Sequence, residues 1–169
     1  MEREYLLDTT YIMPFFGIDV TIPDLKKDIA RILPVHGKFI HITSCSLVEA
    51  KWKAIRNFNK TGRKEYLARA NKALDSIGAN KYIQVINAWF VKDASHRADA
   101  LLFSGHQDYM DCWIAGAAVA LNMTLVSEDE VLVQSIKKQD GVQWRAFRCI
   151  QWGDFLNELD GNRSDQEES

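Results

Sequence analysis

The segment from Asp108 to Asp129 combines carboxylates with apolar elements that could bury them. Asp108 and Asp111 are three residues apart, so they share one face near the start of a helix that stays apolar on nearly all sides to Leu121. A buried, ionised carboxylate is costly unless a positive charge compensates it. Asp129 follows a hydrophobic strand, Thr124–Ser127, at the end where open α/β sheets bind ligands. Acids gathered there indicate a cation.

Each of these acids also has a purely structural explanation. Ser104–Gln107 fits a capping box, which would place Asp108 and Asp111 inside the helix. If the helix starts later, Asp108 is its N-cap and Asp111 is a first-turn acid favoured by the helix dipole. Ser127–Glu130 is another capping-box match, so Asp129 alone could simply start a helix. Only the acids taken together favour a cation-binding site.

Two further acids lie near predicted strand ends. Asp8 ends the short apolar strand Glu4–Asp8, where it could also cap a following helix. Glu49 fits a capping box with Ser46. If that helix begins at Ser44 instead, Glu49 is free on its first turns and points toward the same edge of the sheet.

Strands alternate with helices along the chain, which predicts βαβ units and a three-layer α/β/α sandwich with a central parallel sheet of four to five strands. The expected strands are 4–8, 38–43, 82–86, 124–127 and 144–150. The expected helices are 22–33, two helices within 44–81 separated at Thr61-Gly62, 88–103, 108–121, 130–138 and a last turn or two from Gly153. Residues 1–160 are predicted to form a single domain, followed by a disordered acidic tail, 161–169.

In such a sheet Asp8, Glu49, Asp111 and Asp129 all fall on the carboxyl side of the strands. The sequence has no Gly-rich phosphate loop, which argues against binding of nucleoside triphosphates. No apolar run approaches the length of a membrane span, and the N-terminus lacks the profile of a signal peptide, so we expect an intracellular, cytoplasmic protein.

The cysteines and histidines show no metal-ligand spacing. We interpret the three cysteines as reduced core thiols, and the isolated histidines argue against a zinc site. These residues are Cys45, Cys112, Cys149, His36, His41, His96 and His106.

Four sequence blocks resemble the four acidic blocks of PIN domains, the metal-dependent ribonucleases that include the VapC toxins of toxin–antitoxin pairs. The blocks are Leu6–Thr10, Thr43–Glu49, Asp111–Ala118 and Leu125–Asp129. The resemblance covers residues 3–150 and implies a PIN-like fold in which Asp8, Glu49, Asp111 and Asp129 bind the metal. It also implies cleavage of RNA phosphodiesters to leave a 5′-phosphate and a 3′-hydroxyl, a homodimer, and, for a toxin, an antitoxin partner.

The sequence departs from the family pattern at three positions. Thr10 stands where Asn or Ser is common, Cys112 replaces a small residue, and Glu128 replaces a frequent basic residue, which would make the rim of the pocket more acidic. Asp108 lies one helical turn before Asp111 and could add a fifth carboxylate. Thr10 and Ser127 are candidates to orient the acids or a water molecule by hydrogen bonds.

The chemistry of the donor set agrees with the resemblance. Oxygen ligands without His or Cys suit Mg²⁺ or Mn²⁺, and such an ion lowers the pKa of bound water and stabilises charge on the attacked phosphate. Two alternatives remain open: an inactive PIN-like module that binds RNA or protein, and a Mg²⁺-dependent phosphatase with Asp8 as nucleophile. Four mutually repelling acids argue against the first, and Thr10, where a second acid would be needed, argues against the second.

A basic stretch follows Glu49 directly. Eight of the 21 Lys and Arg residues lie between Lys51 and Lys72, in a chain whose net charge is only −2. Because a carboxylate site repels a polyanion, RNA phosphates must be held by positive charge outside it. The candidates are Lys51, Arg56, Lys60, Arg63 and Lys64. Trp52 and Tyr66 could stack on bases, although Trp52 is more simply a core residue. A solvated helix pair is the alternative.

Overall fold

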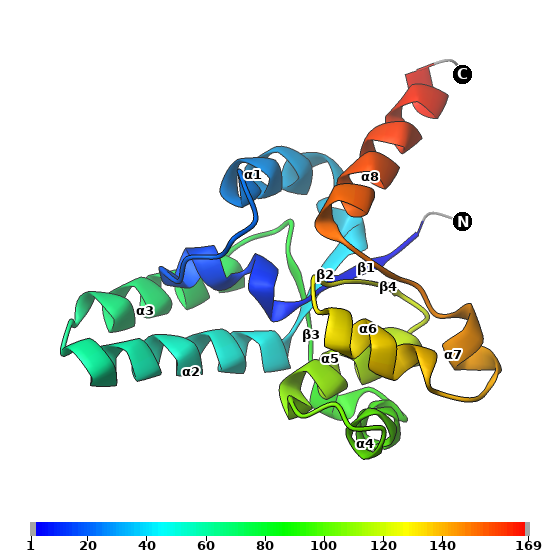
Figure 1. The fold of residues 1–169 in the computed structure, drawn as a ribbon. Helices are drawn as coiled ribbons and strands as arrows, with labels where there is room; N and C mark the ends of the chain where they lie inside the picture. Colours follow the sequence, from blue (N-terminus) through cyan, green and yellow to red (C-terminus); the bar gives the residue numbers. More distant parts are fainter. Residues whose placement is uncertain (1–2, 168–169) are drawn as a thin grey trace.

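Five parallel strands form a central sheet in the part of the chain that the computed structural model describes, the backbone of residues 3–167 and the side chains of residues 3–161 (Figure 1). The strands are β1 (Tyr5–Leu7), β2 (Ile40–Thr43), β3 (Gln84–Ile86), β4 (Thr124–Val126) and β5 (Cys149–Ile150). Their order is β3-β2-β1-β4-β5, and all neighbours run parallel. The predicted parallel sheet is confirmed.

The central strand β1 shows why the sheet is covered on both faces. Tyr5 and Leu7 point into one hydrophobic core, whereas Leu6 between them points into a second. All three side chains are buried. An uninterrupted apolar run is what a parallel strand needs when helices cover both of its faces.

Helices cover both faces of the sheet and complete the predicted three layers (Figure 1). The α-helices are α1 (Leu25–His36), α2 (Ser44–Thr61), α3 (Glu65–Gly78), α4 (Ala94–Phe103), α5 (Tyr109–Ala120), α6 (Glu130–Lys137), α7 (Val142–Ala146) and α8 (Trp152–Glu167). Helices α1, α3 and α8 share the core of Tyr5 and Leu7, whereas α4, α5 and α6 share the core of Leu6. Short 3₁₀ turns are η1 (Thr9–Tyr11), η2 (Met13–Phe16), η3 (Gly37–Phe39) and η4 (Ala88–Phe90).

Small residues allow α5 to pack directly against α4. A Cβ atom on Gly116 would lie 2.5 Å from the carbonyl oxygen of Ala94, so only glycine fits at this contact. Every residue of α5 from Cys112 to Val119 is buried, as the apolar sequence predicts. The close packing fixes the short loop between the two helices, and this loop precedes Asp111.

Several predicted boundaries were wrong. The expected strand 144–150 is shortened to Cys149–Ile150, and residues 144–146 belong to helix α7. Trp144 and Phe147 pack edge to face against each other and against the core of Leu6, which leaves only two residues to pair with β4. The expected helix 88–103 is divided: Asn87 caps η4 alone, and α4 begins at Ala94.

Helix ends also differ from the prediction. Helix α1 continues through Pro34 to His36. Pro34 has no N–H to donate to the carbonyl of Ala30, so the helix lacks this hydrogen bond in its last turn. Helix α8 continues to Glu167, past the predicted start of a disordered tail at Gly161, and residues 168–169 of that tail lie outside the described residues. Gly62, with φ of +70°, ends α2 as predicted. Among the described helices, none has the length and apolar character that a membrane crossing requires.

Candidate metal centre

Asp8 lies at the point where the order of the sheet reverses. Strand β1 pairs with β2 on one side and β4 on the other, and such switch points are where open α/β sheets bind ligands. The Ser127 hydroxyl, from the end of β4, donates to Asp8 Oδ2 at 3.0 Å, and the Thr9 N–H donates to Asp8 Oδ1 at 2.5 Å. Burial raises the pKa of Asp8 to about 6, although both hydrogen bonds oppose that rise. The predicted contact of Ser127 with an acid is present.

Asp108 and Asp111 have different roles at the start of α5. The helix begins at Tyr109, and the exposed Asp108 is its N-cap, accepting the Met110 N–H at 2.9 Å. The later of the two predicted helix starts is therefore correct, and Ser104 instead ends α4. The pKa of Asp111 is raised to about 8. Burial is the largest cause, and repulsion from the carboxylates of Asp8, Asp108, Glu49 and Asp129 adds to it.

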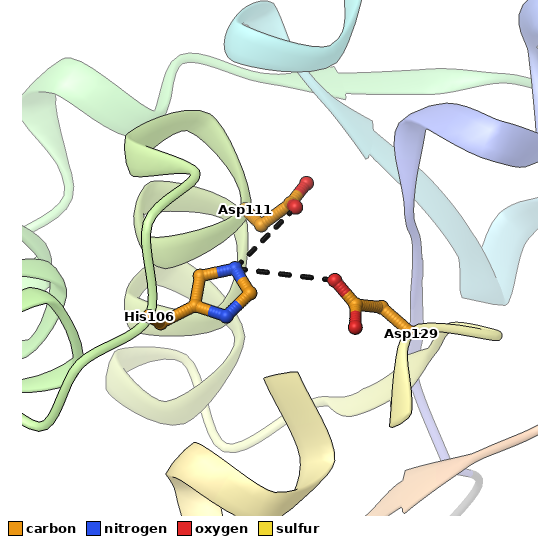
Figure 2. A group of neighbouring side chains, drawn as sticks. All are labelled: His106, Asp111 and Asp129. Carbon is orange, nitrogen blue, oxygen red and sulfur yellow. Dashed lines mark ion pairs between the residues drawn. The ribbon is translucent and has the colours of Figure 1, made fainter. Parts of the chain in front are cut away.

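Asp129 serves both the fold and the site. Its Oδ1 accepts the N–H groups of Val131 and Leu132 at 2.8 and 3.0 Å, so it caps α6 as the structural explanation predicted. Its Oδ2 points the other way, toward Asp111 and His106 (Figure 2). One carboxylate thus starts a helix and still offers an oxygen to the acid cluster.

Glu49 does not cap a helix. Helix α2 begins at Ser44, and Thr43 is the cap, because its hydroxyl accepts the Ser46 N–H at 3.0 Å. The buried Glu49 therefore lies beyond the cap, with Lys53 Nζ 2.5 Å from its Oε1. Its Oε2 is buried and has no hydrogen-bond partner among the described residues.

His106 joins the acids, which the sequence analysis did not predict. Its Nε2 lies 3.5 Å from Asp111 Oδ2 and 3.9 Å from Asp129 Oδ2 (Figure 2). One donor atom from each of the three residues lies within 4.8 Å of the others. The sequence analysis treated the acidic donors as a set without histidine, and the structure adds the His106 imidazole beside them. The available signal was a polar residue in the short loop just before Asp111, and it has no spacing motif.

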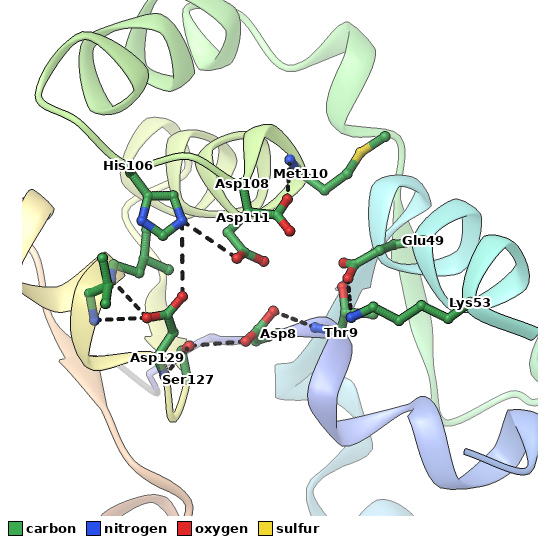
Figure 3. Close-up of polar contacts among 12 residues, drawn as sticks. Asp8, Thr9, Glu49, Lys53, His106, Asp108, Met110, Asp111, Ser127 and Asp129 are labelled. Atoms are coloured by element: carbon green, nitrogen blue, oxygen red, sulfur yellow. Dashed lines mark hydrogen bonds and ion pairs between the residues drawn. The ribbon is translucent and has the colours of Figure 1, made fainter. Parts of the chain in front are cut away.

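The four predicted acids come from four elements and face one space (Figure 3). Asp8 follows β1, Glu49 is on α2, Asp111 is on α5 and Asp129 starts α6. Carboxylate oxygens of this kind, with buried donor atoms left unpaired on Glu49 and His106, match the ligand preferences of a divalent cation. The residues present therefore fit the metal that the sequence resemblance implies.

The groups that contact Asp8 are the backbone of Thr9 and the hydroxyl of Ser127, and a role for Thr10 stays a prediction. The Glu128 carboxylate accepts hydrogen bonds from the Tyr11 hydroxyl at 3.1 Å and from the backbone N–H of Trp152 at 2.8 Å. It thereby links the start of α8 to η1, and its expected effect on the acidity of the pocket rim stays a prediction.

The basic candidates lie on a helical hairpin formed by α2 and α3, which extends away from the sheet (Figure 1). Arg56, Lys60, Arg63 and Lys64 are exposed, whereas Lys51 Nζ donates to Asn71 Oδ1 on the neighbouring helix. Trp52 is 61% exposed, so its expected place in the core is wrong. The hairpin therefore offers exposed positive charge toward its tip and an exposed aromatic side chain, Trp52, one helical turn after Glu49.

This sheet order, with acids at its switch point, defines a PIN-like α/β/α fold, as the acidic blocks predicted. Neither a family model nor a curated protein matches the sequence. Solved structures do share the fold. PAE2754 from Pyrobaculum aerophilum is 16% identical, with a TM-score of 0.59 over 94% of this chain and 90% of that one.

Two toxin–antitoxin complexes are also similar. VapBC2 from Rickettsia felis, bound to a DNA fragment from its promoter, gives a TM-score of 0.57 at 16% identity over 88% of this chain and 98% of that one. DNA-bound VapBC from Salmonella typhimurium gives 0.56 at 13% identity over 89% and 99%. The fold of this chain is that of the VapC-like PIN structures.

Proposed function

We propose that this chain is a metal-dependent endoribonuclease of the VapC type, which hydrolyses RNA phosphodiester bonds at Asp8, Glu49, Asp111 and Asp129. The observation that carries the proposal is the convergence of these carboxylates on the switch point of the sheet, where burial raises the pKa of Asp8 to about 6 and of Asp111 to about 8. Carboxylates that raise each other's pKa are costly for the fold and are explained by a cation.

The four acids would hold Mg²⁺ or Mn²⁺, and each is oriented by the fold. Ser127 and the Thr9 backbone fix both oxygens of Asp8, and the first N–H groups of α6 fix one oxygen of Asp129. When bound, the ion would lower the pKa of a water molecule and offset charge on the attacked phosphate. Without it, Asp111 holds a proton at neutral pH, because its pKa is raised to about 8.

The direct test is incubation of the purified chain with a pool of total RNA in Mn²⁺ or Mg²⁺. Sequencing of the new ends should find a 5′-phosphate and a 3′-hydroxyl at each cleavage position. Excess EDTA should abolish cleavage, and Mn²⁺ added beyond the chelator should restore it. Cleavage that continues in EDTA, or that leaves a 2′,3′-cyclic phosphate, would exclude the mechanism.

We propose an antitoxin partner because two structures of the same fold are VapBC complexes on DNA. The partner would be a small DNA-binding protein that blocks the acidic pocket with a basic side chain, and its reading frame should lie next to the gene for this chain. We also propose that the chain pairs with a second copy, as PIN toxins usually do. A monomer in sedimentation equilibrium at high concentration would contradict that pairing.

The exposed basic residues of the α2–α3 hairpin should carry the RNA past the acidic centre. Changing Arg56, Lys60, Arg63 and Lys64 to Gln should weaken binding of a single-stranded RNA. Each lost phosphate contact should lower the slope of log affinity against log salt by about 0.7. Fluorescence anisotropy from low to moderate salt measures both quantities.

The matched control removes four exposed lysines from other elements: Lys26, Lys92, Lys137 and Lys138. It lowers the net charge equally, so it should reduce affinity slightly and leave the salt slope near that of the unmodified chain. Affinity for Mn²⁺ should be unchanged in both variants. If the two variants show the same slope of log affinity against log salt, the hairpin makes no specific contacts with phosphates and is only a solvent-exposed surface.

A further inference from the structure

We propose that His106 is a nitrogen ligand of the metal centre and that it makes the centre prefer Mn²⁺ and other transition-metal ions to Mg²⁺. The inference rests on the proposed metal site and deepens it, because it assigns a residue and an ion preference that four carboxylates alone would not produce.

The position of His106 is set by the packing of α4 against α5. The loop between these helices is short, and the backbone N–H of His106 donates to the carbonyl of Leu101 at 3.3 Å. The contact of Gly116 with Ala94 keeps the two helices together. The imidazole is only 3% exposed and faces Asp111 and Asp129 rather than solvent (Figure 2).

The distances around Nε2 suit a shared ion better than direct hydrogen bonds. An N–H···O bond spans about 2.7–3.2 Å, and the two N···O separations are 3.5 and 3.9 Å. Ligand atoms that each lie about 2.1 Å from one ion are roughly 3 to 4 Å apart, depending on the angle between them. The gap between His106, Asp111 and Asp129 therefore has the size that a bound cation would fill.

The imidazole also lacks any other partner that would explain its burial. Neither ring nitrogen of His106 has a hydrogen-bond partner among the described residues. A buried polar atom left unpaired costs about 1–3 kcal/mol. His41 on β2 is equally unpaired and 5% exposed, but it is not grouped with the acids. Of these two buried histidines, only His106 is aimed at carboxylate oxygens.

An imidazole in the ligand set changes which ion binds best. Mg²⁺ prefers oxygen ligands and keeps several waters, whereas imidazole suits the transition metals, whose affinities generally rise from Mn²⁺ through Fe²⁺ and Co²⁺. Adding one nitrogen to a carboxylate cluster should therefore raise the affinity for Mn²⁺ more than that for Mg²⁺.

Isothermal titration with Mn²⁺ and with Mg²⁺ tests the preference. His106→Asn should raise the Kd for Mn²⁺ at least about tenfold, and that for Mg²⁺ less than about threefold. His41→Asn removes the other buried, unpaired histidine and should leave both values near those of the unmodified chain. An unchanged ratio of the two Kd values in His106→Asn would overturn the inference.

A spectroscopic measurement on the unmodified chain avoids any dependence on the folding of a variant. Pulsed EPR of the Mn²⁺ complex should detect coupling to a histidine nitrogen, and labelling with ¹⁵N-histidine should change that coupling. A Mn²⁺ complex without nitrogen coupling would also overturn the assignment.

Asp111→Asn separates this inference from the proposed function. If Asp111→Asn abolishes Mn²⁺ binding while His106→Asn leaves the ion preference intact, only the role of His106 fails. If Asp111→Asn binds Mn²⁺ as the unmodified chain does, the acidic metal centre itself fails.

Discussion

Changing Asp111 to Asn should slow RNA cleavage about a thousandfold, which corresponds to roughly 4 kcal/mol of transition-state stabilisation. Asp111 is the acid whose surroundings include each of the other three predicted acids, and its Oδ2 also faces His106. Asn keeps the shape of the side chain but removes the charge and one acceptor oxygen, so it removes a ligand without opening a cavity. Single-turnover rates with saturating enzyme measure the effect free of RNA binding and product release.

Asp140→Asn is the matched control, because Asp140 is an exposed aspartate in the turn after α6. It should cleave RNA at a rate close to that of the unmodified chain. Affinity of Asp111→Asn for RNA should stay within about threefold, since the proposed phosphate contacts lie on the basic hairpin and not on the carboxylates. A rate for Asp111→Asn within a few-fold of the unmodified chain would exclude this acid from catalysis.

The same substitution should stabilise the metal-free protein at alkaline pH. Burial and neighbouring carboxylates raise the folded-state pKa of Asp8 to about 6 and of Asp111 to about 8, from a usual value of 3.8. The folded state therefore keeps protons that the unfolded state releases. The stabilisation from protonated Asp8 and Asp111 is fully present below about pH 4 and is lost as pH rises through these folded-state pKa values. Asn at position 111 cannot ionise, so most of this loss should disappear.

Thermal melting in EDTA at pH 5 and pH 8.5 measures the difference. At pH 8.5 Asp111→Asn should melt roughly 5–10 °C above the unmodified chain, from a few kcal/mol and about 2–4 °C per kcal/mol for a chain of this size. At pH 5 the difference should be much smaller, because pH 5 lies only about one unit above the unfolded-state pKa of 3.8 and well below the folded-state pKa of about 8. Asp140→Asn should follow the unmodified chain at both values.

Mn²⁺ should remove most of this difference in melting temperature at pH 8.5. At a hundred times its Kd an ion adds about 2.7 kcal/mol to the stability of a protein that binds it only when folded. The unmodified chain should gain this stability, and Asp111→Asn should not. If Asp111→Asn instead melts well below the unmodified chain in EDTA at pH 8.5, the acid stabilises the start of α5 and is not a repelled member of a metal centre.

The sequence by itself determined the architecture and the four acids. Alternation of apolar strands with helices specifies a parallel sheet, and right-handed crossovers bring the carboxyl ends of the strands and the starts of the helices to one edge. Asp8 and Asp129 follow strands, and Glu49 and Asp111 lie near helix starts, so their meeting was predictable without coordinates. The small residues around Gly116 likewise predicted a helix packed on most sides.

Only the structure could decide which of the acids cap helices and which are free to take part in the site. Several residues near Asp8, Glu49, Asp111 and Asp129 could each cap a helix, and the competing helix starts differ by only a few residues. The structure resolves them through particular hydrogen bonds: Thr43 rather than Ser46 caps α2, and Asp108 rather than Ser104 caps α5. Asp129 has both roles, because its two oxygens point in different directions.

Only the tertiary structure could place His106, Glu128 and Trp52. His106 reaches the acids because a loop and two packed helices turn it inward. Glu128 follows β4 and contacts Tyr11 and the start of α8, which follow the neighbouring strands β1 and β5. Trp52 is exposed because the small residues Ala50 and Ala54 occupy the buried face of α2. Strand β5 is short because Trp144 and Phe147, which precede it, pack against the core of Leu6 instead of extending the strand. These positions depend on contacts between distant segments, which spacing along the chain does not encode.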